Sequence, residues 1–242
     1  MMLQPPDAWE YLLAIDARCI FDDATMVKIS SLEIPGFNNQ LVPNTFYQQK
    51  SAASRLAIVL PGYGYSTQMP LLYYATRILL ELGADVLSVD YAYNKIPEYK
   101  QAAEDEKMRW LMADVTAACQ MGLVQGDYNA ITLVGKSLGT VAIARMIADT
   151  GLITPASICW LTPVLDMELV RQGIIDNFSR SFVAIGTADA YYDAAFIEPL
   201  SIDAPDRVMV IENADHGLEN KDDVLQSVFD MESVMQALDG FL

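Results

Sequence analysis

The chain has 242 residues, of which 52% are hydrophobic and 19% are charged, and its formal net charge is −17. This length is enough to bury the core of one α/β domain. A surface this acidic repels phosphate backbones and anionic lipid, so we expect no nucleic acid and no charged membrane face as a partner, and we assign the acidity to solubility.

The sequence lacks the usual patterns of secretion and membrane insertion. A signal peptide has a basic segment followed by an apolar run. Asp7, Glu10 and Asp16 interrupt residues 1–22, so we expect no signal peptide there. No apolar run approaches the ~20 residues that span a bilayer. The three cysteines are scattered and odd in number, as is typical of core residues in a reducing compartment. We therefore expect a soluble cytoplasmic protein.

The N-terminal part of the chain is predicted to form an extension followed by antiparallel strands. Residues 1–24 are assigned to the extension. Val27 to Ile34 and Leu41 to Tyr47 have the composition of strands, and Pro35-Gly36 between them is typical of a turn. We therefore expect antiparallel edge strands within residues 25–50.

From residue 56 onward, short apolar runs alternate with amphipathic segments. Continuous apolar runs are typical of strands that are covered on both faces. The predicted strands are Leu56–Leu60, Asp85–Val89, Ala130–Val134, Ser157–Thr162, Val183–Ile185 and Arg207–Ile211. The predicted helices are Thr67–Leu82, Glu104–Met121, Ser137–Asp149 and Asp222–Leu242, with Gly83, Gly122 and Gly151 at or near the ends of the first three. This alternation predicts one α/β domain over residues 1–242, a three-layer α/β/α sandwich around a mostly parallel sheet.

The strongest motif is Gly135-Lys136-Ser137-Leu138-Gly139, which directly follows a predicted strand and opens a helix. A nucleophile on so sharp a turn needs glycine two residues before and two after it, because side chains there would clash. The turn raises the hydroxyl above the carboxyl edge of the sheet, where parallel sheets hold their chemistry, and places it at a helix N-terminus. We predict that Ser137 is a nucleophile rather than a simple N-cap.

A serine hydroxyl needs a base, and His216 is the only histidine of the chain. It follows the last predicted strand and lies downstream of the serine, as the chain order Ser…Asp…His requires. The acid that orients the imidazole should lie between them, after an intervening strand. Asp189 is the first choice, Asp193 is the second and Asp166 is the third.

Two backbone N–H groups are predicted to stabilise a tetrahedral oxyanion. One belongs to Leu138, which follows the nucleophile. The other belongs to Tyr63, in the loop Leu60-Pro61-Gly62-Tyr63-Gly64, whose glycines let the backbone approach a substrate.

These four segments, namely Leu60–Gly64, Gly135–Gly139, Gly186–Asp189 and Asp215–Gly217, resemble the α/β-hydrolase superfamily in order and spacing over residues 25–242. The resemblance implies an eight-stranded sheet and a Ser-His-Asp mechanism through an acyl-enzyme, with no cofactor and no metal. Many relatives have histidine before the oxyanion glycine, where this chain has Pro61. The segment between Thr162 and Val183 is too short for a large helical cap, so the site is expected to be open, as in small dienelactone hydrolases and carboxylesterases.

Two nucleotide-binding motifs are alternative interpretations of the same glycines. Gly62-Tyr63-Gly64 follows a strand, and Asp90 ends the next one, as in a dinucleotide fingerprint. However, Thr67 replaces the third glycine. Gly135-Lys136-Ser137 resembles the end of a P-loop, but position 130, where the first glycine would lie, is Ala130. Zinc is disfavoured by the single histidine and the distant cysteines.

Aromatic side chains and one methionine cluster in the loops at the predicted catalytic edge and are candidates to line an apolar pocket. They are Tyr63, Tyr65, Met69, Tyr91, Tyr93, Tyr191 and Tyr192. The predicted substrate is a carboxylic ester or thioester of modest size. An amide or peptide hydrolase and a non-catalytic scaffold with the same fold are the alternatives.

Overall fold

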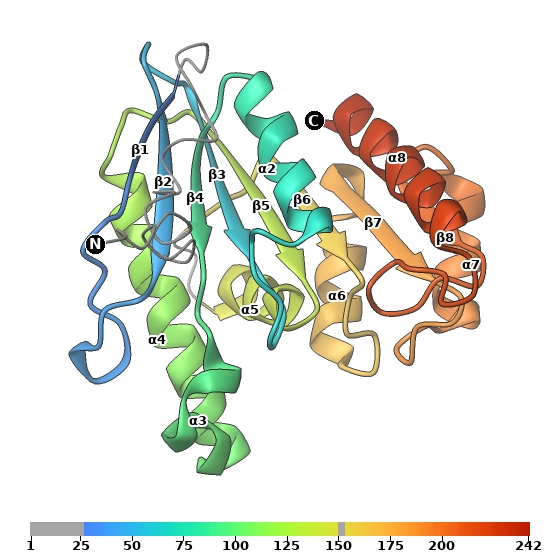
Figure 1. Cartoon of the computed structure of the whole chain (residues 1–242), viewed down its shortest axis with the longest axis horizontal. Coiled ribbons are helices and arrows are strands. Elements are labelled where there is room, and N and C mark those ends of the chain that lie inside the picture. The colour runs from blue at the N-terminus through green and yellow to red at the C-terminus, as the bar shows by residue number, and fades with distance from the viewer. Residues whose placement is uncertain (1–26, 150–152) are drawn as a thin grey trace, which may run out of the picture.

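The computed structural model describes residues 27–149 and 153–242 (Figure 1). The extension predicted over residues 1–24 lies outside them. Eight strands form one sheet in the order β1-β2-β4-β3-β5-β6-β7-β8. The strands are β1 (Val27–Ser30), β2 (Asn44–Gln49), β3 (Arg55–Leu60), β4 (Asp85–Val89), β5 (Ala130–Lys136), β6 (Ser157–Leu161), β7 (Ser181–Gly186) and β8 (Val208–Ile211). The α-helices are α2 (Pro70–Glu81), α3 (Pro97–Gln101), α4 (Glu104–Leu123), α5 (Leu138–Asp149), α6 (Glu168–Asp176), α7 (Ala194–Asp203) and α8 (Val224–Phe241).

The predicted antiparallel edge is confirmed, although its strands have different bounds. β1 pairs antiparallel with β2, β2 pairs antiparallel with β4, and all other neighbours are parallel. β1 ends at Ser30 rather than Ile34, because the side chain of Asn44 satisfies the main chain of Leu32. Its Oδ1 accepts from Leu32 N at 2.9 Å and its Nδ2 donates to Leu32 O at 2.8 Å. These groups are thereby removed from the strand ladder.

Helices cover both faces of the sheet, so the predicted three-layer sandwich is confirmed (Figure 1). α2 and α8 pack on one face, where Leu72 and Leu238 are fully buried. α4, α5 and α6 pack on the other face, around Leu111 and Ile174. The central strands are mostly apolar, and every residue from Leu56 to Leu60 is fully buried. Such burial on both faces is what continuous apolar strands require.

Two predicted helix ends differ from the structure, one for a packing reason and one because of a proline. Gly122 does not stop α4, which continues to Leu123. A Cβ on this glycine would lie 3.2 Å from a methyl of Leu87 and 3.3 Å from one of Leu56, so glycine lets the helix approach the sheet closely. α2 begins at Pro70 instead of Thr67. Proline suits the first turn of a helix, where its missing N–H has no partner to lose.

Candidate active site

Ser137 occupies the sharp turn between β5 and α5. Its φ is +52°, a left-handed conformation that is uncommon for residues other than glycine. Its N–H donates to Leu161 O at 3.0 Å, and its carbonyl accepts from Thr140 N at 2.8 Å. The backbone is therefore held in a strained conformation by bonds to both sides of the turn, as is common at functional sites.

Two glycines make this turn sterically possible. A Cβ on Gly135 would lie 2.7 Å from the Cδ1 of Ile143 and 2.8 Å from the main chain of Gly139. A Cβ on Gly139 would overlap the carbonyl oxygen of Leu60. The spacing of the motif thus follows from contacts that any larger residue would break.

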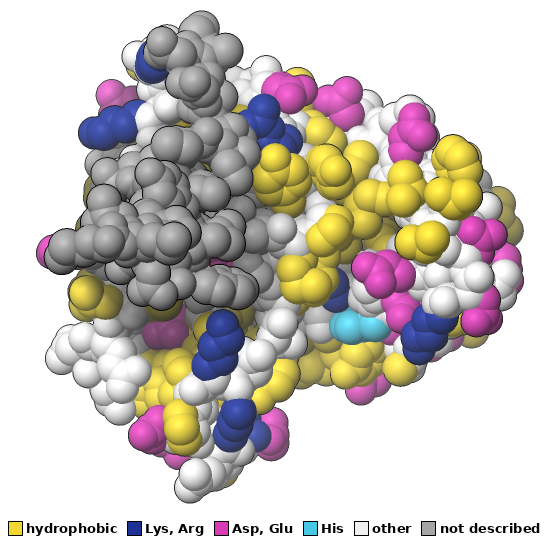
Figure 2. Space-filling view, in the orientation of Figure 1, with side chains coloured by type: hydrophobic (Ala, Val, Ile, Leu, Met, Phe, Trp, Pro, Cys, Tyr) yellow, Lys and Arg dark blue, Asp and Glu magenta, His cyan; other side chains and the backbone are white. Residues whose placement is uncertain are grey.

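The imidazole of His216 lies between Ser137 and Asp189. Nε2 is 2.8 Å from Ser137 Oγ, and Nδ1 is 2.8 Å from Asp189 Oδ2. A carboxylate can only accept, so in the neutral imidazole Nδ1 carries the proton and Nε2 is free to accept from the serine hydroxyl. The Asp189 side chain is fully buried and that of His216 is 35% exposed. The row therefore runs from a buried acid to an accessible imidazole, which is cyan in Figure 2.

Asp189 is the carboxylate that meets the imidazole, and the two alternatives lie elsewhere. The second oxygen of Asp189 accepts from Tyr191 N at 2.9 Å. Asp193 caps α7 and pairs with Arg171 at 2.7 Å, which lowers the pKa of its carboxyl. Asp166 is exposed, just before α6.

The loop that carries His216 is fixed to the end of β7. Ala188 N donates to Ala214 O at 3.0 Å, and Asn213 N donates to Thr187 Oγ1 at 2.8 Å. A Cβ on Gly186 would overlap the same carbonyl of Ala214. Because Asp189 follows these residues directly, the acid and the base are held by one set of contacts.

The loop after β3 lies against the serine. A Cβ on Gly62 would be 3.0 Å from Ser137 Cβ and 3.5 Å from its Oγ. Within residues 27–149 and 153–242, the N–H groups of Tyr63 and Leu138 donate to no other protein group. These N–H groups, on the residues that follow Gly62 and Ser137, are therefore compatible with the predicted oxyanion donors.

Tyr91 differs from its prediction as a pocket residue, because it is 3% exposed and lies beneath this loop. Its hydroxyl donates to Pro61 O at 2.8 Å. Its ring stacks on Tyr93, which stacks on Tyr99, with centroid distances of 4.6 and 4.2 Å. Desolvation raises the pKa of the Tyr91 hydroxyl, so it remains a donor. The buried rings support the loop from within, and Tyr91 and Tyr93 line a separate cavity of about 190 Å³ that includes none of Ser137, His216 and Asp189.

The remaining pocket candidates, four tyrosines and one methionine, lie nearer the surface. Tyr63 and Met69 are 52% and 41% exposed. The Tyr191 ring approaches the His216 ring edge-on, with centroids 5.2 Å apart. Tyr65 and Tyr192 are partly buried, and the Tyr65 hydroxyl accepts from the N–H of Leu71 at 3.3 Å. Figure 2 shows hydrophobic and acidic side chains gathered around the imidazole.

The groups proposed for nucleotide binding have other partners. Asp90 accepts from Thr67 N at 2.9 Å and from Thr67 Oγ1 at 2.7 Å, so both of its oxygens bind the residue that replaces the third glycine. Among the described residues, no three His, Cys, Asp or Glu side chains are placed to hold a metal ion. No helix in this part of the chain is long and apolar enough to cross a bilayer.

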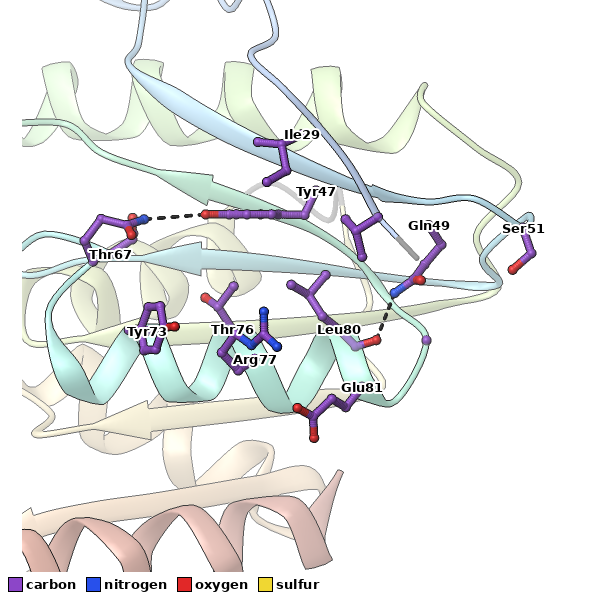
Figure 3. Close-up of a pocket in the computed structure, with 13 residues that line it drawn as sticks. Ile29, Tyr47, Gln49, Ser51, Thr67, Tyr73, Thr76, Arg77, Leu80 and Glu81 are labelled. Atoms are coloured by element: carbon purple, nitrogen blue, oxygen red, sulfur yellow. Dashed lines mark hydrogen bonds between the residues drawn. The ribbon is translucent and has the colours of Figure 1, made fainter. Parts of the chain in front are cut away.

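A cavity of about 410 Å³ lies away from the serine, between the edge strands and α2 (Figure 3). Tyr47 and Gln49 of β2 line one side, and Thr76 and Leu80 of α2 line the other. Gln49 Nε2 donates to Leu80 O at 2.9 Å across it. None of the three residues of the hydrogen-bonded row belongs to this cavity.

No protein-family model matches the chain, and no curated protein matches it. Solved structures do match. An esterase from Pyrobaculum calidifontis has 15% identity and a TM-score of 0.59 over 88% of this chain and 85% of its own. A lidless α/β serine hydrolase from Xanthomonas campestris has 15% identity and a TM-score of 0.57 over 91% and 97%. A dienelactone hydrolase from Anabaena variabilis has 16% identity and a TM-score of 0.56 over 86% and 96%. The chain therefore has the α/β-hydrolase fold, with the eight strands that the sequence resemblance implies.

Proposed function

We propose that the protein is a serine hydrolase that cleaves a carboxylic ester or thioester of modest size through an acyl-enzyme. The observation that carries the proposal is the row of two 2.8 Å hydrogen bonds from Ser137 through His216 to Asp189. Structures this distant in sequence show the fold, so the catalytic mechanism is argued from this geometry.

In the proposed reaction, Ser137 Oγ attacks the carbonyl carbon while His216 Nε2 takes the hydroxyl proton. The carbonyl oxygen becomes an oxyanion, which the N–H groups of Tyr63 and Leu138 stabilise. When the intermediate collapses, Nε2 gives the proton to the departing alcohol or thiol. A water molecule then attacks the acyl-enzyme with the same imidazole as base. The acyl–Oγ bond breaks, the imidazolium returns the proton to Ser137 Oγ and the carboxylic acid leaves, while Asp189 stabilises the imidazolium without taking its proton.

Two features bear on the substrate, the first on an ester over an amide and the second on its modest size. Several solved structures of the same fold are described as esterases. The imidazole is 35% exposed, in keeping with an open site for a small substrate.

We also propose that the chain acts as a single cytoplasmic domain. The described cysteines, Cys119 and Cys159, are free and buried, which suits a reducing compartment.

A fluorophosphonate probe tests the nucleophile. We expect the wild-type protein to form a covalent adduct on Ser137, and Ser137→Ala to form none. Ser233→Ala, at an exposed serine of α8, is the matched control and should label like the wild type. Protein that folds normally but never reacts would refute the hydrolase and favour a non-catalytic scaffold.

A panel of p-nitrophenyl esters of graded acyl length then tests the substrate class. The preferred acyl group is next offered as a thioester and as an amide, so that only the leaving group changes. We expect ester or thioester turnover to exceed amide turnover by at least ~10-fold, since an amine is the poorer leaving group. The reverse order would assign the site to amides.

A further inference from the structure

Lys136 is the residue before the proposed nucleophile, and its side chain is buried, with 2% exposed. Its Nζ donates to His216 O at 2.9 Å and to Thr162 Oγ1 at 3.1 Å. The ring of Tyr65 covers it, with the centroid 4.7 Å from Nζ. One ammonium thus connects the end of β5, the end of β6, the loop after β3 and the loop of the imidazole.

The groups that hold this cation are mainly neutral, so burying its charge costs free energy. Burial lowers the pKa of the Lys136 ammonium to about 8, while the carboxylates of Asp189 and Asp215 act in the opposite direction. The remaining titratable groups in contact with it are His216 and the phenol of Tyr65, whose pKa burial raises to about 12. Buried charges without a close counter-ion are rare, and a perturbed one beside a reactive centre points to a role there.

The imidazole loop has strained backbone on both sides of His216, beyond the contacts that fix it to β7. Asn213 and Leu218 on either side of His216 have φ of +59° and +57°. Positive φ is disfavoured for a leucine and persists only where surrounding contacts hold it. The carbonyl of His216 lies between these two residues, and the Lys136 ammonium is the group that binds it.

We infer that Lys136 is a positioning residue: its ammonium holds the main-chain carbonyl of His216 and so keeps the imidazole in line with Ser137 and Asp189. The inference rests on the proposed hydrolase function. Because the lysine acts through the histidine, its loss should change the rate of the chemical step more than the binding of substrate.

The kinetic test compares Lys136→Met with the wild type on the best ester. Methionine keeps the length of the side chain but has no donor and no charge. We expect kcat to fall about 10- to 100-fold, the range that a displacement of about 1 Å produces, with KM changed less than about threefold. Lys221→Met removes the same charge from the exposed end of the His216 loop and should change kcat less than about twofold. Lys136→Arg, which keeps charge and donors, should restore part of the loss.

The single histidine allows a second readout that needs no activity. In tag-free protein labelled with ring-¹⁵N histidine, every histidine NMR signal belongs to His216. We expect the Nδ1 proton, bonded to Asp189, to exchange slowly in the wild type and in Ser137→Ala, and faster in Lys136→Met. If the methionine variant does not fold, Lys136→Gln, also uncharged, serves in both measurements.

The outcomes separate the two proposals. A wild type that hydrolyses esters, beside a folded Lys136→Met with unchanged kcat, would overturn the positioning role and leave the hydrolase intact. A fall in kcat with the same Nδ1 exchange would overturn it too, because the lysine would then act without moving the imidazole. A wild type without probe labelling or turnover would refute the hydrolase, and the exchange measurement would still decide whether Lys136 holds the imidazole.

Discussion

Burying the Lys136 ammonium should have a measurable effect on the free energy of unfolding and on its pH dependence. Its pKa falls from 10.5 to about 8, mainly because burial removes the ammonium from water. A difference of this size between the unfolded and folded chain corresponds to about 3 kcal/mol of destabilisation at neutral pH. Between pH 8 and 10.5 the unfolded chain holds a proton that the folded lysine has lost. The free energy of unfolding should therefore rise with pH in this window, by about 2 kcal/mol between pH 8 and pH 10.

Lys136→Met isolates this contribution. The variant lacks the titrating group, and it also leaves His216 O and Thr162 Oγ1 without their donor, at a cost of about 1–3 kcal/mol. The two effects nearly offset each other at pH 7, so the proteins should have similar stability there. At pH 10 the wild type should be more stable by about 2 kcal/mol.

Urea unfolding of both proteins at pH 7, 8, 9 and 10 measures the difference directly. Tyrosines and the other lysines titrate in both proteins, so their contributions cancel in the subtraction. A stability difference that stays constant with pH would show that the buried ammonium keeps its ordinary pKa and would refute the reasoning. If the variant instead becomes the more stable protein as pH rises, the predicted direction of the lysine pKa shift is wrong.

Asp189→Asn should lower kcat by ~10⁴, because an amide no longer fixes the imidazole tautomer or stabilises imidazolium; Asp193→Asn should change it less than about threefold, and the reverse result would exchange their roles. Gly139→Ala should lower the free energy of unfolding in urea by at least ~3 kcal/mol, because its methyl would overlap the carbonyl of Leu60. Unchanged stability would mean that the turn has room to relax. The kcat/KM for a non-titrating ester should fall on the acid side of its pH profile, because a protonated imidazole cannot accept the proton of the serine; a flat acid limb would exclude His216 as the base.

The central strands and long helices could be predicted because their sequence patterns and their packing agree. β4 has the predicted bounds, Asp85–Val89, and all five of its residues are buried between its neighbours β2 and β3, as its mostly apolar sequence favours. The helices α6 and α7 were not predicted. Gly173 lies within the first and Pro199 within the second, so the local helix propensity of both segments is weak. Packing decides instead, as a Cβ on Gly173 would lie 3.2 Å from the Trp160 ring.

The three residues of the hydrogen-bonded row could be placed from sequence because each follows a recognisable strand in a fixed chain order. The contacts of Lys136 could not be predicted from the sequence. They depend on residues 26 and 80 positions away, which meet only once the sheet has formed. The available signal was a lysine that ends an otherwise apolar strand. Tyr91 was misplaced for a similar reason, since sequence places it in a loop but does not reveal that its ring packs inward.

Strain in the described backbone concentrates where the proposed chemistry lies. Four non-glycine residues with positive φ, namely Ser137, Thr162, Asn213 and Leu218, belong to the carboxyl edge of the sheet around the imidazole. Thr162, with φ of +44°, is β-branched and also binds the buried Lys136 ammonium. Each feature costs free energy, and the fully buried strands beneath supply the stability that keeps all of them in place. The strained residues and the buried ammonium lie together because together they position a hydroxyl, an imidazole and the donors beside them.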